Sequence, residues 1–195
     1  MSARVEHPLL TELIDNPRLF DERGRAYQLL QEYYSGLSIE TLRPLLRSQD
    51  VWIQRSASFI AAELGEQSRP LLEDVLPLMN SNDLHIQNYA MEVLTICCDG
   101  ERAECFAHVA EKLASEDEGI RLQAIDLVAN ARRQQLEAAL RFFARHHNRQ
   151  DHARGLRGLL AAEGQDRRVS ASMLNDPDPL VRAYGEVAFK RAGHA

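Results

Sequence analysis

The chain has 195 residues and a formal charge of −6, and 45% of its residues are hydrophobic and 27% are charged. This balance predicts a folded globular protein, because disordered chains contain fewer apolar residues. A chain that is acidic as a whole is not expected to bind nucleic acid phosphates in general, since like charges repel.

Three cysteines, Cys97, Cys98 and Cys105, are present. An odd number with two adjacent residues is a poor disulfide framework, so we expect reduced thiols and a cytoplasmic protein. The first ten residues, MSARVEHPLL, lack the apolar segment of a secretory signal, and no run of 18 apolar residues occurs. We therefore expect neither export by that route nor a membrane span.

At the N-terminal end, apolar residues occur at helical spacing without clear repeat signals. Phe20 lies 33 positions before Ile53. Phe20, Gly24, Tyr27 and Leu30 are predicted to lie on one helix face. Two later segments, LRPLLRS and VLPLMNS, place Pro44 and Pro77 at the same register. A proline at this position predicts a bend or the start of a helix.

A longer pattern then recurs along the chain. It consists of a small polar residue, an aspartate two or three positions later, a β-branched residue followed by Gln or Arg, and apolar residues at helical spacing. Its copies are SQDVWIQRSASFIAA at 48, SNDLHIQNYAMEVLT at 81, SEDEGIRLQAIDLVA at 115 and LNDPDPLVRAYGEVA at 174. A poorer copy is NRQDHARGLRGLLAA at 148. No alternating pattern typical of strands competes with them, so the sequence predicts an all-α fold.

The aspartates of the four clear copies are predicted to cap the helix that follows, which stabilises it by roughly 1 kcal/mol each. They are Asp50, Asp83, Asp117 and Asp178. After the first of them, Ile53, Ala57, Ile60 and Leu64 recur at the spacing of one buried stripe. The small second residue of the stripe, which is Gly185 in the last copy, predicts close contact between helices.

These residues resemble the HEAT repeat, an antiparallel helix pair with Asp in the turn and Val-Arg or Ile-Arg at the start of the second helix. Gln54 and Gln87 depart from that pattern by replacing Arg. The resemblance implies a single-domain, right-handed α-solenoid of about six HEAT-like helix pairs. Each pair would bury its apolar face only against its neighbours, and the second helices would line a concave surface. The units are approximately 1–36, 37–66, 67–100, 101–131, 132–163 and 164–195, of which 1–36 and 132–163 are degenerate.

Residues on the second helices that point away from the buried stripe are the candidate binding surface. In this fold they would form a ladder of stacked side chains, and aromatic residues and arginines are enriched among binding hot spots. A packing role between neighbouring helices is the alternative for Trp52 and Phe59, since large aromatic residues are usually partly buried. The candidate surface comprises Trp52, Arg55, Phe59, His85, Asn88, Tyr89, Glu92, Gln123 and Asp126.

A basic sector lies at 132–168, where nine arginines and four acidic residues give a net charge of +5 and leave −11 for the rest of the chain. Three interpretations remain open: a solvated arginine face, an acidic protein partner, or a phosphate backbone as in HEAT-like DNA glycosylases. The arginines considered are Arg132, Arg133, Arg141, Arg145, Arg149, Arg154 and Arg157.

The segment RHHNRQDH suggests a metal site through His146, His147, Asp151 and His152, but no matching ligands occur on another unit. We therefore interpret them as surface histidines and expect no metal and no cofactor. Cys97 and Cys98 are interpreted as small packing residues. No catalytic motif occurs in the sequence, so nothing predicts an enzyme.

The sequence thus favours a cytoplasmic protein-binding module or adaptor, monomeric or weakly homo-oligomeric. Its acidic charge suggests an immunity or antitoxin protein that covers a basic nuclease toxin. The alternative is a HEAT-like DNA-binding or DNA-repair protein that uses 132–168. A third hypothesis, an accessory lyase or chaperone, has no residue in its favour.

Overall fold

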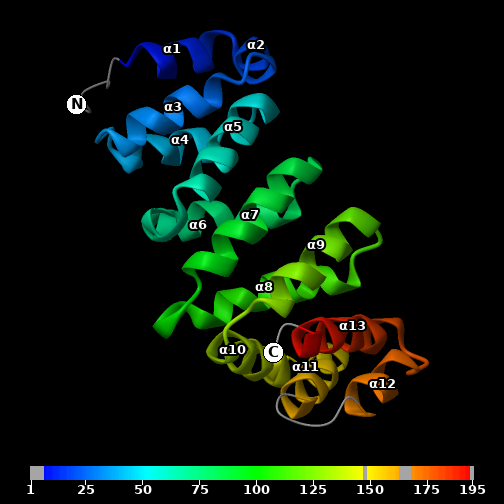
Figure 1. Cartoon of the computed structure of the whole chain (residues 1–195). Helices are drawn as coiled ribbons and strands as arrows, with labels where there is room; N and C mark the ends of the chain where they lie inside the picture. The colour runs from blue at the N-terminus through cyan, green and yellow to red at the C-terminus, as the bar shows by residue number, and fades with distance from the viewer. Residues whose placement is uncertain (1–6, 147–148, 163–167, 194–195) are drawn as a thin grey trace. The chain divides into compact units, whose positions relative to one another are not determined.

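The computed structural model describes residues 7–146, 149–162 and 168–193, and within these ranges the chain is helical and contains no strand (Figure 1). The predicted all-α class is confirmed. Internal contacts divide the chain into two compact units, 1–93 and 94–195, which are described separately. In the described ranges, no helix is both long and apolar enough to cross a bilayer.

The N-terminal unit is built around α5, which packs against α2, α3 and α4. Short 3₁₀ segments (η) alternate with the α-helices. The elements in order are α1 (Pro8–Asp15), α2 (Pro17–Glu22), α3 (Arg25–Tyr34), η1 (Ile39–Thr41), α4 (Leu42–Leu46), α5 (Val51–Glu63), η2 (Gly65–Leu71), α6 (Leu72–Val75), η3 (Leu76–Asn80) and α7 (Leu84–Cys97), which crosses the division between the units.

The helix face predicted at 20–30 is only partly present. Phe20 and Leu30 are buried, but Gly24 has a φ of 64° and separates α2 from α3. A left-handed backbone conformation ends a helix, so the register of α2 does not continue into α3. As a result Tyr27 is 60% exposed, and its predicted place on the buried face is wrong.

The two repeated prolines occupy short helical segments, as predicted for a bend or a helix start. Pro44 lies inside the five-residue α4, and Pro77 lies in the first turn of η3. Proline lacks the amide hydrogen that a long α-helix needs at each interior position. The segments before α5 and α7 are broken into short 3₁₀ and α pieces, as is the segment before α9, which contains no proline.

A buried carboxylate connects these short segments. The side chain of Asp74 on α6 is 1% exposed and accepts a hydrogen bond from Nη1 of Arg43 at 2.5 Å. Nε of Arg47 also donates to Asp74. Arg43 further donates to the carbonyl of Pro70 at 2.9 Å, so one carboxylate and two arginines link α4 with α6 and η2.

The C-terminal unit contains the remaining elements. They are η4 (Gly100–Phe106), α8 (Ala107–Glu111), η5 (Lys112–Ala114), α9 (Glu118–Ala129), α10 (Arg133–Arg145), α11 (Gln150–Ala162), α12 (Arg168–Leu174) and α13 (Pro179–Gly193). The last helix, α13, packs against α11 and α12 and also against α9.

The contact between α13 and α9 departs from the expectation that each helix pair packs only against its sequence neighbours. Nη1 of Arg191 donates to the carbonyls of Ala129, the last residue of α9, at 2.9 Å and of Ala131, just after the helix, at 2.8 Å. Lys190 forms an ion pair with Asp126. These bonds satisfy carbonyls that a helix end leaves without partners, and they hold α13 to a helix two units earlier in the sequence.

The predicted capping aspartates are confirmed in all four clear copies. Each accepts a hydrogen bond from a backbone amide of the following helix. The bonds join Asp50 to Trp52 (2.8 Å), Asp83 to Ile86 (3.1 Å), Asp117 to Ile120 (2.9 Å) and Asp178 to Leu180 (2.9 Å).

The residue after the β-branched position also has one structural role in the four copies. Its side chain reaches back to a backbone carbonyl of the preceding turn and satisfies it. Gln54 donates to Ser48, Gln87 to Ser81, Arg121 to Ser115 and Arg182 to Asp176. Glutamine therefore makes the same bond as arginine, and the four turns share one hydrogen-bonding scheme.

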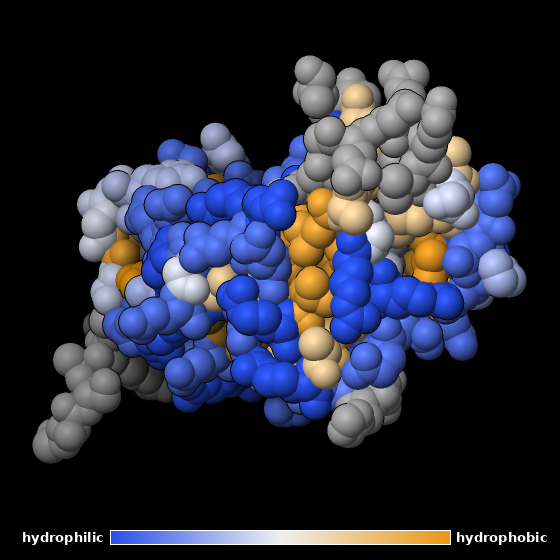
Figure 2. Space-filling view, turned by 90° about the horizontal axis from the view of Figure 1, so that it is seen from below, coloured by the Kyte–Doolittle hydropathy of each residue, from blue (hydrophilic) through white to orange (hydrophobic). Residues whose placement is uncertain are grey.

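The buried stripe is also confirmed. Ile53, Ala57 and Ile60 are buried along one face of α5, and Leu64, the residue directly after the helix, is buried too. On α13, a Cβ added to Gly185 would lie 2.8 Å from the backbone nitrogen of Leu174 on α12, which is closer than such contacts allow. Hydrophilic residues cover most of the surface in view in Figure 2, with smaller hydrophobic areas between them.

Candidate functional site

Arg55 is the centre of a side-chain cluster in the N-terminal unit. It lies on α5 and forms an ion pair with Asp83, the capping residue of α7, and its Nη1 lies 3.7 Å from Oδ2 of Asp21 on α2. The side chains of Arg55 and Asp83 are 23% and 12% exposed. One half-buried cation thus joins α2, α5 and the start of α7.

Trp52 lies one helical turn before Arg55 and is half-buried. The guanidinium carbon of Arg55 is 4.6 Å from the centre of the Trp52 ring, and that of Arg18 on α2 is 5.8 Å away. Cations at these distances are attracted to the face of an aromatic ring. Trp52 therefore packs against arginines of α2 and α5 and keeps some exposed surface, and its binding role stays a prediction.

An aromatic pair adjoins this cluster. The rings of Phe59 on α5 and Tyr89 on α7 meet edge to face with their centres 5.7 Å apart. Burial raises the pKa of Tyr89, and the negative charges of Glu92, Asp21 and Glu63 raise it further against the opposing charge of Arg55. The field at Tyr89 is therefore dominated by carboxylates.

The surrounding carboxylates differ in the direction in which the folded protein shifts their pKa. Burial raises the pKa of Asp21 despite the nearby charge of Arg55, and burial followed by the charge of Glu63 raises the pKa of Glu92. Burial would also raise the pKa of Asp83, but hydrogen bonds from Arg55 and from the amide of Ile86 lower it below its ordinary value. Arg55 and the Ile86 amide thus offset the effect of burial on the pKa of Asp83, whereas Arg55 offsets it only partly for Asp21.

Three buried polar atoms on these helices have no hydrogen-bond partner among the described residues. They are Nε of Arg55, Oγ of Ser56 and Oδ1 of Asn88. A polar atom that is buried without a partner costs about 1–3 kcal/mol, so native proteins contain few of them.

We call this region the Arg55 surface, and it combines residues that the sequence analysis singled out with two that it missed. The members identified from sequence are Trp52, Arg55, Phe59, Asn88, Tyr89 and Glu92, all half-buried, and the exposed His85. The members missed as site residues are Asp21 and Glu63. Asp21 lies in the degenerate first unit and gave no repeat signal. Glu63 follows the last aligned position of its copy by one residue.

The other two predicted members belong to the C-terminal unit. Gln123 and Asp126 both lie on α9. Asp126 forms an ion pair with Lys190 of α13 while its side chain stays 51% exposed, and its place on the binding surface stays a prediction. The ion pair results from the return of α13 to α9, which the repeat pattern does not encode.

The two units differ in net charge. Residues 1–93 contain eight arginines and 14 acidic residues, a net charge of −6, whereas 15 basic and 15 acidic residues cancel in 94–195. The whole formal charge of the chain therefore resides in the unit that carries the Arg55 surface.

Most arginines of the basic sector are neutralised by neighbouring carboxylates. The shortest nitrogen–oxygen distances are Arg132–Asp99 at 3.7 Å, Arg133–Glu137 at 2.8 Å, Arg145–Glu104 at 2.5 Å, Arg149–Glu111 at 3.0 Å and Arg154–Asp178 at 2.8 Å. Arg141 and Arg157 are exposed. A sector with this pairing presents much less positive potential than its sequence suggests.

The histidine segment departs from the prediction of surface residues. His146 is exposed, and His147 lies outside the described residues. His152, however, is 4% exposed, stacks on Phe143 with ring centres 4.6 Å apart, and has Nδ1 3.1 Å from the hydroxyl of Tyr184. It is buried because α10, α11 and α13 pack around it. Within the described ranges, no group of three or more potential ligands is placed to hold a metal ion.

The expectation that all three cysteines are reduced is wrong. Cys98 and Cys105 form a disulfide, with their Cα atoms 5.7 Å apart. The chain reverses direction after α7, and η4 brings Cys105 beside Cys98, a proximity that the spacing of seven residues did not reveal. Cys97 is buried, as expected of a packing residue.

Comparisons with known proteins do not identify the chain. No family model matches it, and no curated protein matches it. Among solved structures, one engineered protein is 16% identical over 85% of this chain and 83% of its own, with a TM-score of 0.49. Another is 16% identical over 84% of this chain and 50% of its own, also with a TM-score of 0.49. Likenesses at this level carry no argument about function.

Proposed function

We propose that this chain is a HEAT-like repeat protein that binds another protein through the Arg55 surface. The repeat assignment is supported by the four turns that share one capping aspartate and one back-bonding Gln or Arg. The six-unit, single-domain, right-handed solenoid remains part of this proposal. The packing of α13 on α9 indicates that its last units depart from regular stacking.

The binding role is carried by one observation, the gathering of partly exposed aromatic residues and carboxylates around Arg55. Trp52 and Tyr89 are half-buried, and residues of their type supply much of the binding energy at protein interfaces because they bury large area at low entropic cost. They are held in place by Arg55 and Phe59. A rigid surface of this kind suits a protein partner.

The charge of the N-terminal unit favours a basic partner. A net charge of −6 in residues 1–93 would accelerate association with a positively charged protein and oppose association with nucleic acid. An immunity or antitoxin protein that covers the active site of a basic toxin in the cytoplasm fits this description. The chain would need no cofactor for that role.

Replacing Trp52 and Tyr89 together with alanine is expected to weaken capture of the partner at least about tenfold, because hot-spot aromatic residues dominate interface energies. The measurement is affinity capture from native lysate with the wild-type and variant chains, followed by identification and quantification of the captured proteins. Addition of salt should slow association of the wild-type chain, since the attraction between opposite charges is screened.

A matched control removes two aromatic side chains elsewhere. Tyr27 and Phe189 are 60% and 59% exposed, so their replacement by alanine should leave both capture and thermal unfolding unchanged. Equal capture by the wild-type chain and the Trp52 and Tyr89 double variant, with both chains folded, would refute the proposed surface.

The alternative, a HEAT-like DNA-binding or DNA-repair protein that uses 132–168, has less support. Five of the seven arginines considered there form ion pairs with carboxylates. Strong, salt-dependent retention on duplex DNA at low salt would favour this alternative over the protein-binding proposal.

A further inference from the structure

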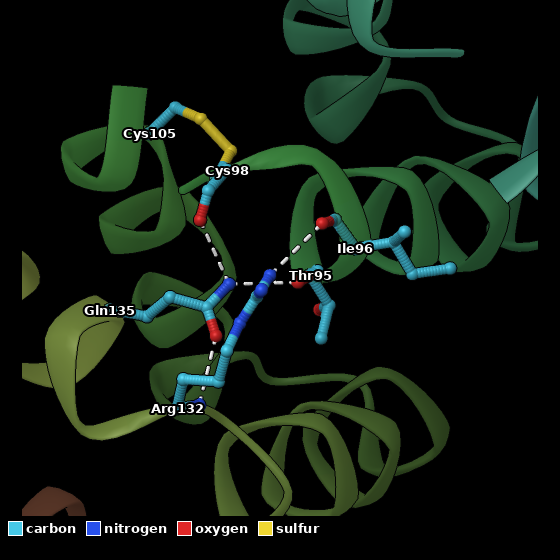
Figure 3. The surroundings of a disulfide bond; sticks show 6 residues. All are labelled: Thr95, Ile96, Cys98, Cys105, Arg132 and Gln135. Carbon is cyan, nitrogen blue, oxygen red and sulfur yellow. Dashed lines mark hydrogen bonds between the residues drawn. A yellow bond between two sulfur atoms is a disulfide. The ribbon is translucent and has the colours of Figure 1, made fainter. Parts of the chain in front are cut away.

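The disulfide between Cys98 and Cys105 closes the turn between α7 and η4 (Figure 3). Cys98 is the first residue after α7 and is fully buried, whereas Cys105 lies in η4 and is only partly buried. Cys105 is therefore the more solvent-exposed of the two residues.

The backbone around Cys98 is held by bonds that do not involve sulfur. The buried side-chain amide of Gln135 on α10 donates to the carbonyls of Cys98 at 2.9 Å and Thr95 at 2.8 Å. Its oxygen accepts from the backbone amide of Arg132 at 2.9 Å, and the guanidinium of Arg132 donates to the carbonyl of Ile96 at 3.2 Å. Figure 3 shows these bonds converging on the last turn of α7.

The segment that carries Cys105 is anchored in a different way. Ala103 and Phe106 of η4 are buried, and α10 packs directly against η4. Helix α10 thus holds both cysteine-bearing segments, one by hydrogen bonds and the other by apolar packing.

From this geometry we propose that Cys98 and Cys105 form a reversible thiol–disulfide exchange site that reacts with low-molecular-weight thiols such as glutathione. Segments that stay in place when the bond breaks keep the two thiols close together, and this high effective concentration favours re-formation of the bond. The fold of the C-terminal unit then does not depend on the disulfide. This inference is independent of the proposed protein-binding function.

The exchange begins at Cys105, the more exposed cysteine. A glutathione thiolate attacks Sγ of Cys105, a mixed disulfide forms, and Cys98 leaves as a thiolate that takes a proton from water. A second glutathione thiolate then attacks the glutathione sulfur of the mixed disulfide and releases Cys105, which also becomes protonated. Two electrons reduce the protein disulfide, and two glutathione molecules are oxidised to one glutathione disulfide.

The test equilibrates the full-length folded protein with mixtures of reduced and oxidised glutathione. Alkylation and peptide mass spectrometry then quantify the thiols of Cys97, Cys98 and Cys105 separately. We expect Cys98 and Cys105 to convert together and reversibly, Cys97 to remain a thiol throughout, and the helical circular dichroism to stay constant. A disulfide that is reduced only when the chain unfolds, or that never forms between these two residues, would overturn the proposal.

Gln135→Glu tests the positioning argument, because the carboxylate cannot donate to the carbonyls of Cys98 and Thr95. Loss of these bonds should loosen the backbone at Cys98 and lower the effective concentration of the two thiols, so the ratio of oxidised to reduced protein at a fixed glutathione ratio should fall by about fivefold. Gln134→Glu, at the exposed neighbouring position, introduces the same charge and should leave the ratio unchanged. Equal ratios in the two variants contradict the proposal. If Gln135→Glu does not fold, Cys105→Ser is measured instead. The proposal requires that this variant keeps the helicity of the wild-type chain, and a loss of helicity would overturn it.

Discussion

Replacing Asp74 with alanine is expected to lower the free energy of unfolding by about 3 kcal/mol, measured by urea denaturation at neutral pH. The Asp74 side chain is 1% exposed and binds Arg43 and Arg47 through separate oxygens. Removal of the carboxylate would break the ion pair of Arg47 and leave Arg43 with Glu40 as its remaining ionic partner. Their partial exposure, 28% for Arg43 and 66% for Arg47, allows water to solvate them and keeps the cost at the lower end for a broken buried pair.

The adjacent Glu73 provides the control, because it is exposed on the same short helix. Glu73→Ala changes the net charge by the same amount and should alter the unfolding free energy by less than about 0.5 kcal/mol. Asp74→Asn keeps the shape of the side chain and removes its charge, so its free energy of unfolding should lie between those of Asp74→Ala and Glu73→Ala. If Asp74→Ala and Glu73→Ala unfold at the same urea concentration, the carboxylate does not hold α4, α6 and η2 together.

The local structure of the repeats could be predicted from sequence because short-range physics determines it. An aspartate before a helix has amide donors within reach, whatever the rest of the fold does, and all four predicted caps are present. The stripe from Ile53 to Leu64 is buried for a similar reason, since helical spacing alone places these residues on one face.

Contacts between distant segments were not predictable in the same way. Nothing in the pattern around Arg191 indicates that its guanidinium reaches the end of α9, some 60 residues earlier. Gly24 looked like one small residue in a helical stripe, yet its left-handed backbone ends that register. Both features depend on the path of the backbone, which cannot be predicted from the periodicity of the side chains.

The candidate site, like the fold, was predicted where local pattern determines it and missed where distant segments meet. The off-stripe residues of α5 and α7 were identified because the repeat alignment supplied their register. Asp21 was missed because its unit is degenerate, although it lies near Arg55. Cys98 and Cys105 were misjudged because the path of the turn between α7 and η4 brings them together. His152 was misjudged because α13, which comes later in the chain, packs over it.

Acidification is expected to destabilise the chain through His152. Burial among apolar groups, together with the charge of Arg149, lowers the pKa of His152 from an ordinary 6.5 to about 4, and the charges of Glu111, Asp151 and Asp178 oppose this only partly. A histidine with a lowered pKa in the folded state stabilises the fold fully above pH 6.5. The unfolded chain takes up the proton first as pH falls, so this contribution is lost between pH 6.5 and about pH 4. The loss amounts to about 3 kcal/mol, from roughly 1.4 kcal/mol for each pKa unit.

Comparison of variants isolates this contribution from the protonation of carboxylates, which all variants share. His152→Gln keeps a group that can hydrogen bond to Tyr184 but cannot titrate, so its unfolding free energy should fall less steeply between pH 7 and pH 4 than that of the wild-type chain. The difference between the two curves should reach about 3 kcal/mol at the acidic end. His146→Gln, at an exposed position on the same segment, should follow the wild-type curve. Parallel curves for the wild-type chain and His152→Gln would mean that the buried imidazole is protonated as readily in the folded protein as in water, which is incompatible with its packing between Phe143 and Tyr184.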